Sequence, residues 1–256
     1  MTLEHLFKYG LNATPVLMKG LGLTLVLLFI ASTHGLAIDS ETGEQMHAPF
    51  ADRYYVSETG NGSDGSSWSN AFTNLQDALS AASSGDQIWV AAGIYTPGPN
   101  ETDSFNLVPS VSVYGGFKEG DKRLSDRDWE VNLTILSGDI EGDDTNDGNG
   151  VVNDVLDISG DNSYHVVFAD GTTGTPITSK TVLDGFTITA GQADGTNEPN
   201  NLGGGFYCNG SGINNECSPS LKNVTFSGNL AQAGGGMYNH ALNKGTSSPN
   251  LSEVTF

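Results

Sequence analysis

The hexapeptide Leu183-Asp-Gly-Phe-Thr-Ile188 returns twice along the chain, as Leu221-Lys-Asn-Val-Thr-Phe226 and as Leu251-Ser-Glu-Val-Thr-Phe256. Each copy has apolar residues at its first, fourth and sixth positions and Thr at its fifth, and the copies start 38 and 30 residues apart. A glycine-rich motif recurs between them, as Gly203-Gly-Gly-Phe206 and, 31 residues later, as Gly234-Gly-Gly-Met237. A period near 30 residues that contains short β-strands predicts stacked repeats, in a solenoid or a propeller.

A solenoid accounts for these repeats better than a propeller does. Propeller blades need about 40 residues and four strands, whereas each repeat here supplies only two or three short strands. Stacking then places Leu, Val, Ile and Phe above their equivalents in the next coil, and a continuous core results. The Thr between two apolar residues points outward, because successive strand residues alternate between faces. The sequence therefore predicts an all-β protein, a parallel β-helix.

The segment before the repeats predicts further strands and one short helix. Phe72, Leu75, Leu79 and Ala82 recur at helical spacing, which indicates a helix over about 74–83. Thr73 and Gln76 have the spacing of a capping box at its start. Such a helix could cover the first coil and protect its edge. The expected strands here are 54–56, 87–90, 93–95 and 107–114.

Several motifs resemble known families. The segment Gly85-Asp-Gln-Ile-Trp-Val-Ala-Ala-Gly-Ile-Tyr95 and the helix before it resemble the amino-terminal cap of pectate-lyase-like right-handed β-helix proteins. The stretches 113–117, 136–140, 164–167 and 183–188 look like secreted bacterial β-helix proteins. Gly234-Gly-Gly-Met237 and Phe226-Ser-Gly-Asn229 are similar to repeats of polymorphic outer-membrane proteins, although a third Gly and a Met replace the usual Ala and aliphatic residue.

This resemblance covers about 52–256, and it implies a right-handed parallel β-helix. It implies less about function, because that fold hosts lyases, hydrolases, adhesins and inert stalks.

The amino terminus is predicted to direct export. An apolar run of 13 residues spans Gly20–Ser32, after Lys8 and Lys19, and is too short for a bilayer, which needs about 20 residues. Small residues at Gly35 and Ala37 are typical of a signal-peptidase site, which predicts a signal peptide over 1–37. The true start is expected at Met18. An uncleaved anchor helix is the alternative.

The rest of the chain is divided by its composition. Residues 38–52 are expected to be an unstructured leader, and 53–256 the β-helix domain. That domain is expected to be truncated at the C-terminus, because Phe256 ends a repeat strand without a following cap. No membrane-spanning segment is expected in the mature fragment. The chain is then secreted or displayed at the cell surface, on the outer membrane of a Gram-negative-type bacterium if it is anchored.

Charge limits the classes of partner. Asp and Glu number 30 against 10 Lys and Arg, which gives a formal net charge of -20. A nucleic-acid partner is therefore not expected, because phosphate binding needs clustered basic residues. The only cysteines are Cys208 and Cys217, and a disulfide between them is the preferred interpretation for an exported chain. Two free thiols are the alternative.

The segment 138–163 is rich in Asp and Gly and predicts a long surface insertion. Asp143, Asp147 and Asp154 approach the ligand spacing of an EF-hand loop, so Ca²⁺ is the one metal predicted here. Thr145 and Gly150 depart from that pattern, and Asp154 replaces the usual Glu. The alternative is an acidic loop that keeps the protein soluble.

The predicted function is a non-enzymatic extracellular or cell-surface scaffold, adhesin-like, whose partner is a carbohydrate or a cell-surface protein. The alternative is the N-terminal part of a secreted polysaccharide lyase or glycoside hydrolase with catalytic residues beyond Phe256. The adjacent pair Asp143 and Asp144 is interpreted as a solvated loop and not as a catalytic pair. Trp68, Trp89 and Trp129 could stack on a sugar, but packing within the protein is the preferred interpretation.

Overall fold

The computed structural model describes residues 36–38, 45–47 and 52–256. The chain divides into two units, 1–50 and 51–256. In the first unit β1 (Leu36–Ile38) pairs antiparallel with β2 (Gln45–His47), so the pair spans the end of the predicted signal peptide and part of the predicted leader. The predicted start at Met18 and most of the predicted signal peptide lie outside the described residues.

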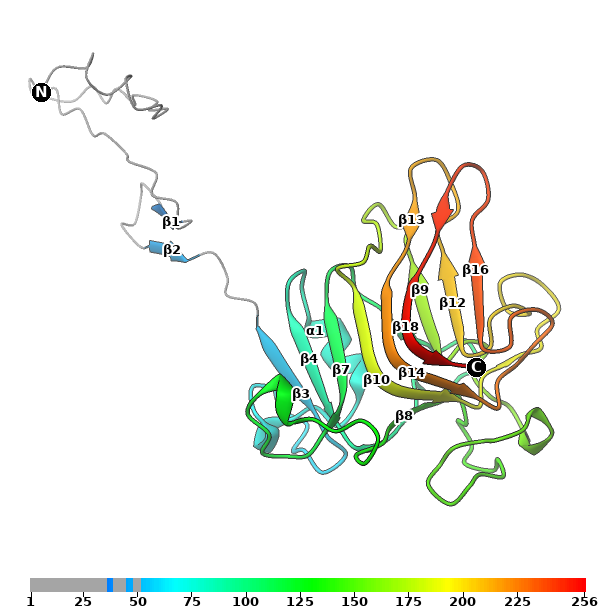
Figure 1. The fold of residues 1–256 in the computed structure, drawn as a ribbon, viewed down its shortest axis with the longest axis horizontal. Coiled ribbons are helices and arrows are strands. Elements are labelled where there is room, and N and C mark those ends of the chain that lie inside the picture. The colour runs from blue at the N-terminus through cyan, green and yellow to red at the C-terminus, as the bar shows by residue number, and fades with distance from the viewer. Residues whose placement is uncertain (1–35, 39–44, 48–51) are drawn as a thin grey trace, which may run out of the picture. The chain divides into compact units, whose positions relative to one another are not determined.

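The second unit consists mainly of short strands (Figure 1). Its strands are β3 (Arg53–Val56), β4 (Gln87–Ala91), β5 (Gly93–Tyr95), β6 (Phe105–Asn106), β7 (Ser112–Phe117), β8 (Thr134–Ser137), β9 (Val167–Asp170), β10 (Val182–Thr189), β11 (Gln192–Ala193), β12 (Phe206–Asn209), β13 (Glu216–Cys217), β14 (Ser220–Ser227), β15 (Leu230–Ala231), β16 (Met237–His240), β17 (Thr246–Ser247) and β18 (Asn250–Thr255). Its helices are α1 (Leu75–Ala81) and the 3-10 turns η3 (Trp68–Asn70), η4 (Leu124–Asp126) and η5 (Val155–Asp157).

All strand pairs of this unit are parallel. The largest sheet runs in the order β18-β14-β10-β7-β4-β3, with β5 and β8 beside this path, and a second sheet runs β16-β12-β9-β6. Figure 1 shows β10, β14 and β18 curving side by side, next to the set of β9, β12 and β16. The prediction of an all-β protein built on parallel sheets is confirmed.

The repeated hexapeptides pair with one another in register. Leu183 pairs with Leu221, and Leu221 with Leu251, so the three copies lie one above another. The two glycine-rich motifs also align, with Phe206 beside Met237. The spacing of apolar residues within each copy therefore sets the register of the sheet, because a slip of one residue would move that apolar set to the other face.

The core lies on the inner side of the two sheets. Leu183, Phe186 and Ile188 are buried there, together with their counterparts in β14. Helix α1 adds its buried face, which consists of Leu75, Ala78 and Leu79. Complete burial of a leucine side chain stabilises the fold by about 1.5–3 kcal/mol, so the one buried face of this short helix holds it in place.

The structure differs from the sequence-based prediction at one helix cap and in one strand. Asn74 caps α1, because its Oδ1 accepts from the Gln76 amide at 2.7 Å, and the predicted cap at Thr73 is wrong. The predicted strand over 107–114 is interrupted. Pro109 lacks an amide donor, Ser110 adopts a φ of 61°, and the chain turns there before β7 begins.

Among the described residues, no helix is long and apolar enough to cross a lipid bilayer. The acidic segment 138–163 forms a long loop that contains η5, and most of its residues are exposed. The buried exceptions are Asp144 and Val152 within the loop and Gly138, Asn162 and Ser163 at its two ends. The insertion is thus attached to the body of the protein at these points, which its composition did not indicate.

Candidate functional site

A groove of about 700 Å³ lies on the outer side of the largest sheet. That volume is within the range of pockets that bind small molecules or short segments of polymers. Its lining comes from the segment between η4 and β8, from the first residue of β8 and from the three repeat strands, namely Trp129, Glu130, Leu133, Thr134, Gly185, Phe186, Thr187, Asn223, Thr225, Glu253, Val254 and Thr255.

The floor of the groove is built by the repeats themselves. Thr187 pairs with Thr225, and Thr225 pairs with Thr255, so the outward Thr of each hexapeptide forms a row of hydroxyl groups. Neighbouring strands lie about 4.7–4.9 Å apart, which sets the spacing of this row. The third residue of each hexapeptide forms a second row of Gly185, Asn223 and Glu253, all with positive φ.

One wall of the groove carries Trp129, whose side chain is 36% exposed. The guanidinium of Arg127 lies 4.7 Å from the centroid of the Trp129 ring. The same group makes an ion pair of 2.7 Å with Asp184 on β10, and both side chains are only 8% exposed. Arg127 therefore connects the tryptophan on the wall to the strands of the floor.

Further contacts hold this connection in one geometry. The side-chain Nδ2 of Asn223 donates to Asp184 Oδ1 at 2.8 Å. The Arg127 guanidinium also donates to the backbone carbonyl oxygens of Gly115 and Asp184. Glycine is needed at Gly185, because its φ is +86° and a Cβ there would lie 2.8 Å from Arg127 Nη1. The wall can approach the sheet only because this position has no side chain.

The charge of the groove is negative. The Glu130 and Glu253 carboxylates line it, and no Lys or Arg does. Arg127 lies behind the wall with its charge paired to Asp184. A ligand in this groove therefore meets hydroxyl groups, an indole and carboxylates that only accept hydrogen bonds.

The structure does not bring the three predicted calcium ligands together. Within the described residues, the one group of three close metal-ligand side chains consists of Asp139, Asp143 and Asp144, with carboxylate oxygens within 4.8 Å of one another. Asp147 instead accepts from the backbone amides of 149 and 151, and Asp154 caps η5 through the backbone amide of 156. Short Asp side chains readily bond to nearby backbone in this way, which separates them from Asp143.

Asp144 is the buried member of this group and accepts two hydrogen bonds from residues later in the insertion. It accepts from the amide of Ser159 at 2.6 Å and from Asn162 Nδ2 at 2.8 Å. Burial raises the pKa of the Asp144 carboxyl above its ordinary value. Its position holds the start of the insertion against the segment that leads into β9, a role that sequence reasoning missed.

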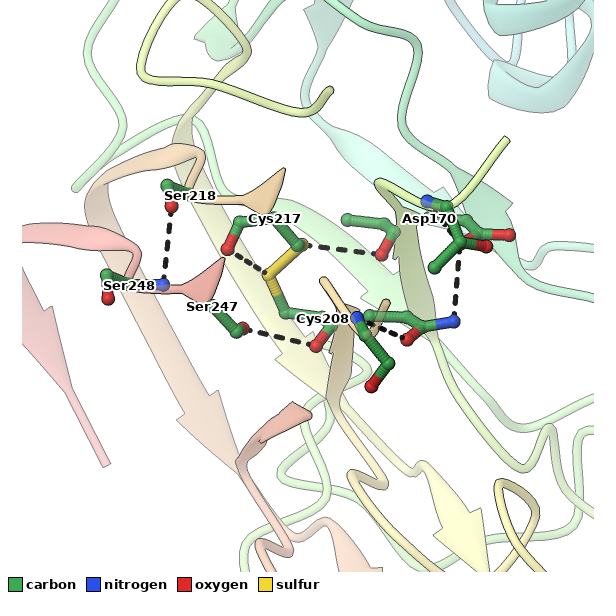
Figure 2. The surroundings of a disulfide bond; sticks show 10 residues. Asp170, Cys208, Cys217, Ser218, Ser247 and Ser248 are labelled. Atoms are coloured by element: carbon green, nitrogen blue, oxygen red, sulfur yellow. Dashed lines mark hydrogen bonds between the residues drawn. A yellow bond between two sulfur atoms is a disulfide. The ribbon is translucent and has the colours of Figure 1, made fainter. Parts of the chain in front are cut away.

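Cys208 and Cys217 form a disulfide with a sulfur–sulfur distance of 2.01 Å (Figure 2). Both residues are completely buried, on β12 and β13, and the bond closes the turn between these strands. In the paired strands β16 and β17, Asn239 and Ser247 occupy the equivalent positions. The Ser247 hydroxyl donates to the Cys208 backbone carbonyl at 3.2 Å, which links β17 to β12 through a hydrogen bond.

The other aromatic residues are largely used in packing. Trp89 is 1% exposed and stacks on Phe117 at 4.4 Å, as the sequence predicted for the tryptophans in general. Phe168, Tyr207 and Tyr238 stack on the neighbouring strands β9, β12 and β16 with interplanar angles of 11° and 13°. Because these rings cover one another's faces, they offer a ligand mainly their edges.

Two histidines flank this aromatic stack. His165 and His240 lie 5.1 and 5.8 Å from the ring centroid of Tyr207. His165 Nδ1 lies 3.0 Å from the carbonyl oxygen of Gly203, and burial lowers the pKa of this histidine. Both residues therefore belong to the packing of the second sheet.

Comparison with known proteins found no matching family model, no similar curated protein and no similar solved structure. Sequence reasoning missed Arg127, Asp184 and Glu253 as parts of a site. The equivalent positions of Gly185, Asn223 and Glu253 in the three hexapeptides were the signal that could have located its floor.

Proposed function

We propose that the chain is a right-handed parallel β-helix, capped by α1, that acts as an extracellular or cell-surface scaffold and binds carbohydrate in the groove beside Trp129. The parallel pairing of all the repeat strands supports the β-helix. Helix α1 packs its apolar face into the same core, which supports its role as a cap. The resemblance to secreted β-helix repeats is consistent with this assignment.

The observation that carries the functional proposal is an indole held at the edge of a row of hydroxyl groups. A tryptophan presents a large, rigid apolar face with little rotamer entropy to lose, which suits the C–H face of a pyranose. The hydroxyl groups of Thr187, Thr225 and Thr255 both donate and accept, as sugar hydroxyl groups do. The ion pair of Arg127 fixes the position of the indole before a ligand arrives, and preorganisation of this kind favours affinity.

The groove supports binding better than catalysis. A glycoside hydrolase of the usual type needs a carboxylic acid whose pKa is raised by an apolar environment beside a second, ionised carboxylate. Glu130 and Glu253 line the groove, but both residues are exposed to solvent. The rival proposal, a polysaccharide lyase or glycoside hydrolase, would therefore need catalytic residues outside this groove.

Export is part of the same proposal. The disulfide between Cys208 and Cys217 suits an oxidising compartment, because the cytosol keeps thiols reduced. The predicted signal peptide over 1–37 supports the same location. If the protein is displayed at the cell surface, we propose that it is attached to an outer membrane of the Gram-negative type. The net charge of -20 disfavours nucleic acid as a partner.

The test is binding of the purified chain to an array of neutral and acidic oligosaccharides, followed by titration calorimetry. Trp129→Ala should weaken binding by roughly tenfold or more, a loss of at least about 1.4 kcal/mol. Leu156→Ala is the matched control, because Leu156 is 87% exposed and does not line the groove. A chain that binds no oligosaccharide, or that binds equally well without Trp129, would refute the proposed function.

A further inference from the structure

We infer that the groove selects an unbranched glycan without acid groups, which lies across β10, β14 and β18. This inference rests on the proposed function and adds the class and the direction of the ligand. It follows from three features of the groove, which are its free charges, the position of its nearest cations and the spacing of its hydroxyl groups.

The free charges of the groove are negative. Glu130 and Glu253 belong to different parts of the chain, one on the wall and one on the floor, and both line the cavity. A sugar hydroxyl can donate a charge-assisted hydrogen bond to either carboxylate. A uronate carboxylate in the same place would bring like charges together in a partly desolvated groove, where their repulsion is stronger than in bulk water.

The nearest cations are not available to offset that repulsion. Arg127 is paired with Asp184 at 2.7 Å, and its side chain is only 8% exposed. Lys222 is exposed and precedes Asn223 on β14, but it does not line the groove. The net charge of -20 adds a long-range field that opposes the approach of any polyanion.

The hydroxyl groups of the floor repeat in one direction. Thr187, Thr225 and Thr255 are register partners on three neighbouring strands, so they recur about every 4.8 Å across the sheet. A ligand that presents hydroxyl groups at regular intervals can match this row only if its axis crosses the strands. A linear glycan has such regular hydroxyl groups, and a branch would meet the wall that carries Trp129.

The experiment compares cellohexaose, mannohexaose and xylohexaose with hexagalacturonate by titration calorimetry at low ionic strength. At least one neutral hexasaccharide should bind roughly tenfold or more tightly than hexagalacturonate. The ratio should shrink when salt is raised, because screening weakens the repulsion of exposed charges.

Two isosteric variants test the origin of the selectivity. The double variant Glu130→Gln with Glu253→Gln should bind hexagalacturonate more tightly than the wild type does. The melting temperature of the protein should stay unchanged. Glu141→Gln with Glu198→Gln is the matched control, because it also removes two negative charges, from exposed residues outside the groove. Equal effects of the control and of the double variant would show that net charge, not the groove, sets the preference, and would overturn the inference.

The outcomes separate this inference from the proposed function. If hexagalacturonate binds as tightly as the neutral probes and Trp129→Ala abolishes that binding, the groove binds carbohydrate but the inferred selectivity is wrong. If a single monosaccharide binds as tightly as a hexasaccharide, the inferred direction across the strands is wrong. If none of the hexasaccharides binds, both the inference and the proposed function are wrong.

Discussion

Replacement of Arg127 by Met tests whether the buried ion pair holds the wall of the groove to its floor. The guanidinium lies 2.7 Å from Asp184 Oδ2, and the side chains of both residues are 8% exposed. Without Arg127, the Asp184 carboxylate keeps only the amide of Asn223, at 2.8 Å, as a side-chain partner. Removal of one member of a buried pair destabilises a protein by about 3–5 kcal/mol, because an uncompensated charge remains.

That loss is large for a single domain. Total stabilities of about 5–15 kcal/mol are usual, and a domain of this size loses about 2–4 °C of melting temperature for each kcal/mol. Arg127→Met should therefore lower Tm by roughly 6–20 °C and shift the urea midpoint accordingly. The intrinsic fluorescence of the folded variant should also move to longer wavelength, because Trp129 loses the guanidinium 4.7 Å from its ring and becomes more exposed to water.

The matched control is Arg123→Met. Arg123 pairs with Asp126 at 2.8 Å, but its side chain is 78% exposed. Exposed pairs contribute little to stability, so this variant should melt within a few degrees of the wild type. In the double variant Arg127→Met with Asp184→Asn, the charge left behind is gone, and the loss should be smaller than the sum of the two single losses. A loss below about 1 kcal/mol for Arg127→Met, or strict additivity in the cycle, would refute the role of the pair.

Three further predictions concern the disulfide and the insertion. Cys208→Ala with Cys217→Ala should lower the free energy of unfolding by about 2–4 kcal/mol, as measured by urea denaturation, and an unchanged midpoint would contradict this. Burial raises the pKa of Asp144, so protonation favours the folded state. Relative to Asp144→Asn, the wild type should then lose stability as the pH rises from about 3 to 6, and a constant difference in urea midpoints would refute the burial effect. Asp147→Asn and Asp154→Asn should change Tm equally with and without calcium, because both side chains are bound to local backbone. If the wild type gains Tm with calcium and either variant loses that gain, the predicted calcium site is supported instead.

The calcium prediction shows what the spacing of Asp residues along the sequence leaves undetermined. Asp143, Asp147 and Asp154 have positions close to those of an EF-hand loop, but spacing alone does not state which polar groups each carboxylate meets. Backbone amides two residues further on capture Asp147 and Asp154. Asp139 and Asp144 join Asp143 instead, because Asp139 accepts from the amides of the turn that follows it.

The strand register and the buried face of the helix could be predicted because their signals are local. In each hexapeptide the order of apolar residues and Thr specifies which side chains face inward, and the three copies then pair in the same register, Leu183 with Leu221 and Leu221 with Leu251. The disulfide partners are only nine positions apart, so the bond between Cys208 and Cys217 also required no knowledge of long-range contacts. Pro109 and Ser110 broke an expected strand because backbone conformation overrode the alternation of side chains.

The groove, in contrast, was determined only by the tertiary structure. Arg127 and Asp184 are 57 residues apart, and nothing in the residues around either one indicates the other. The loop that carries Trp129 reaches the repeat strands because Gly185 leaves room at the point of contact. Periodicity within a repeat can predict which residues face outward. Which of these outward residues come together in one site depends on where a loop distant in sequence packs. That contact forms only in the folded chain.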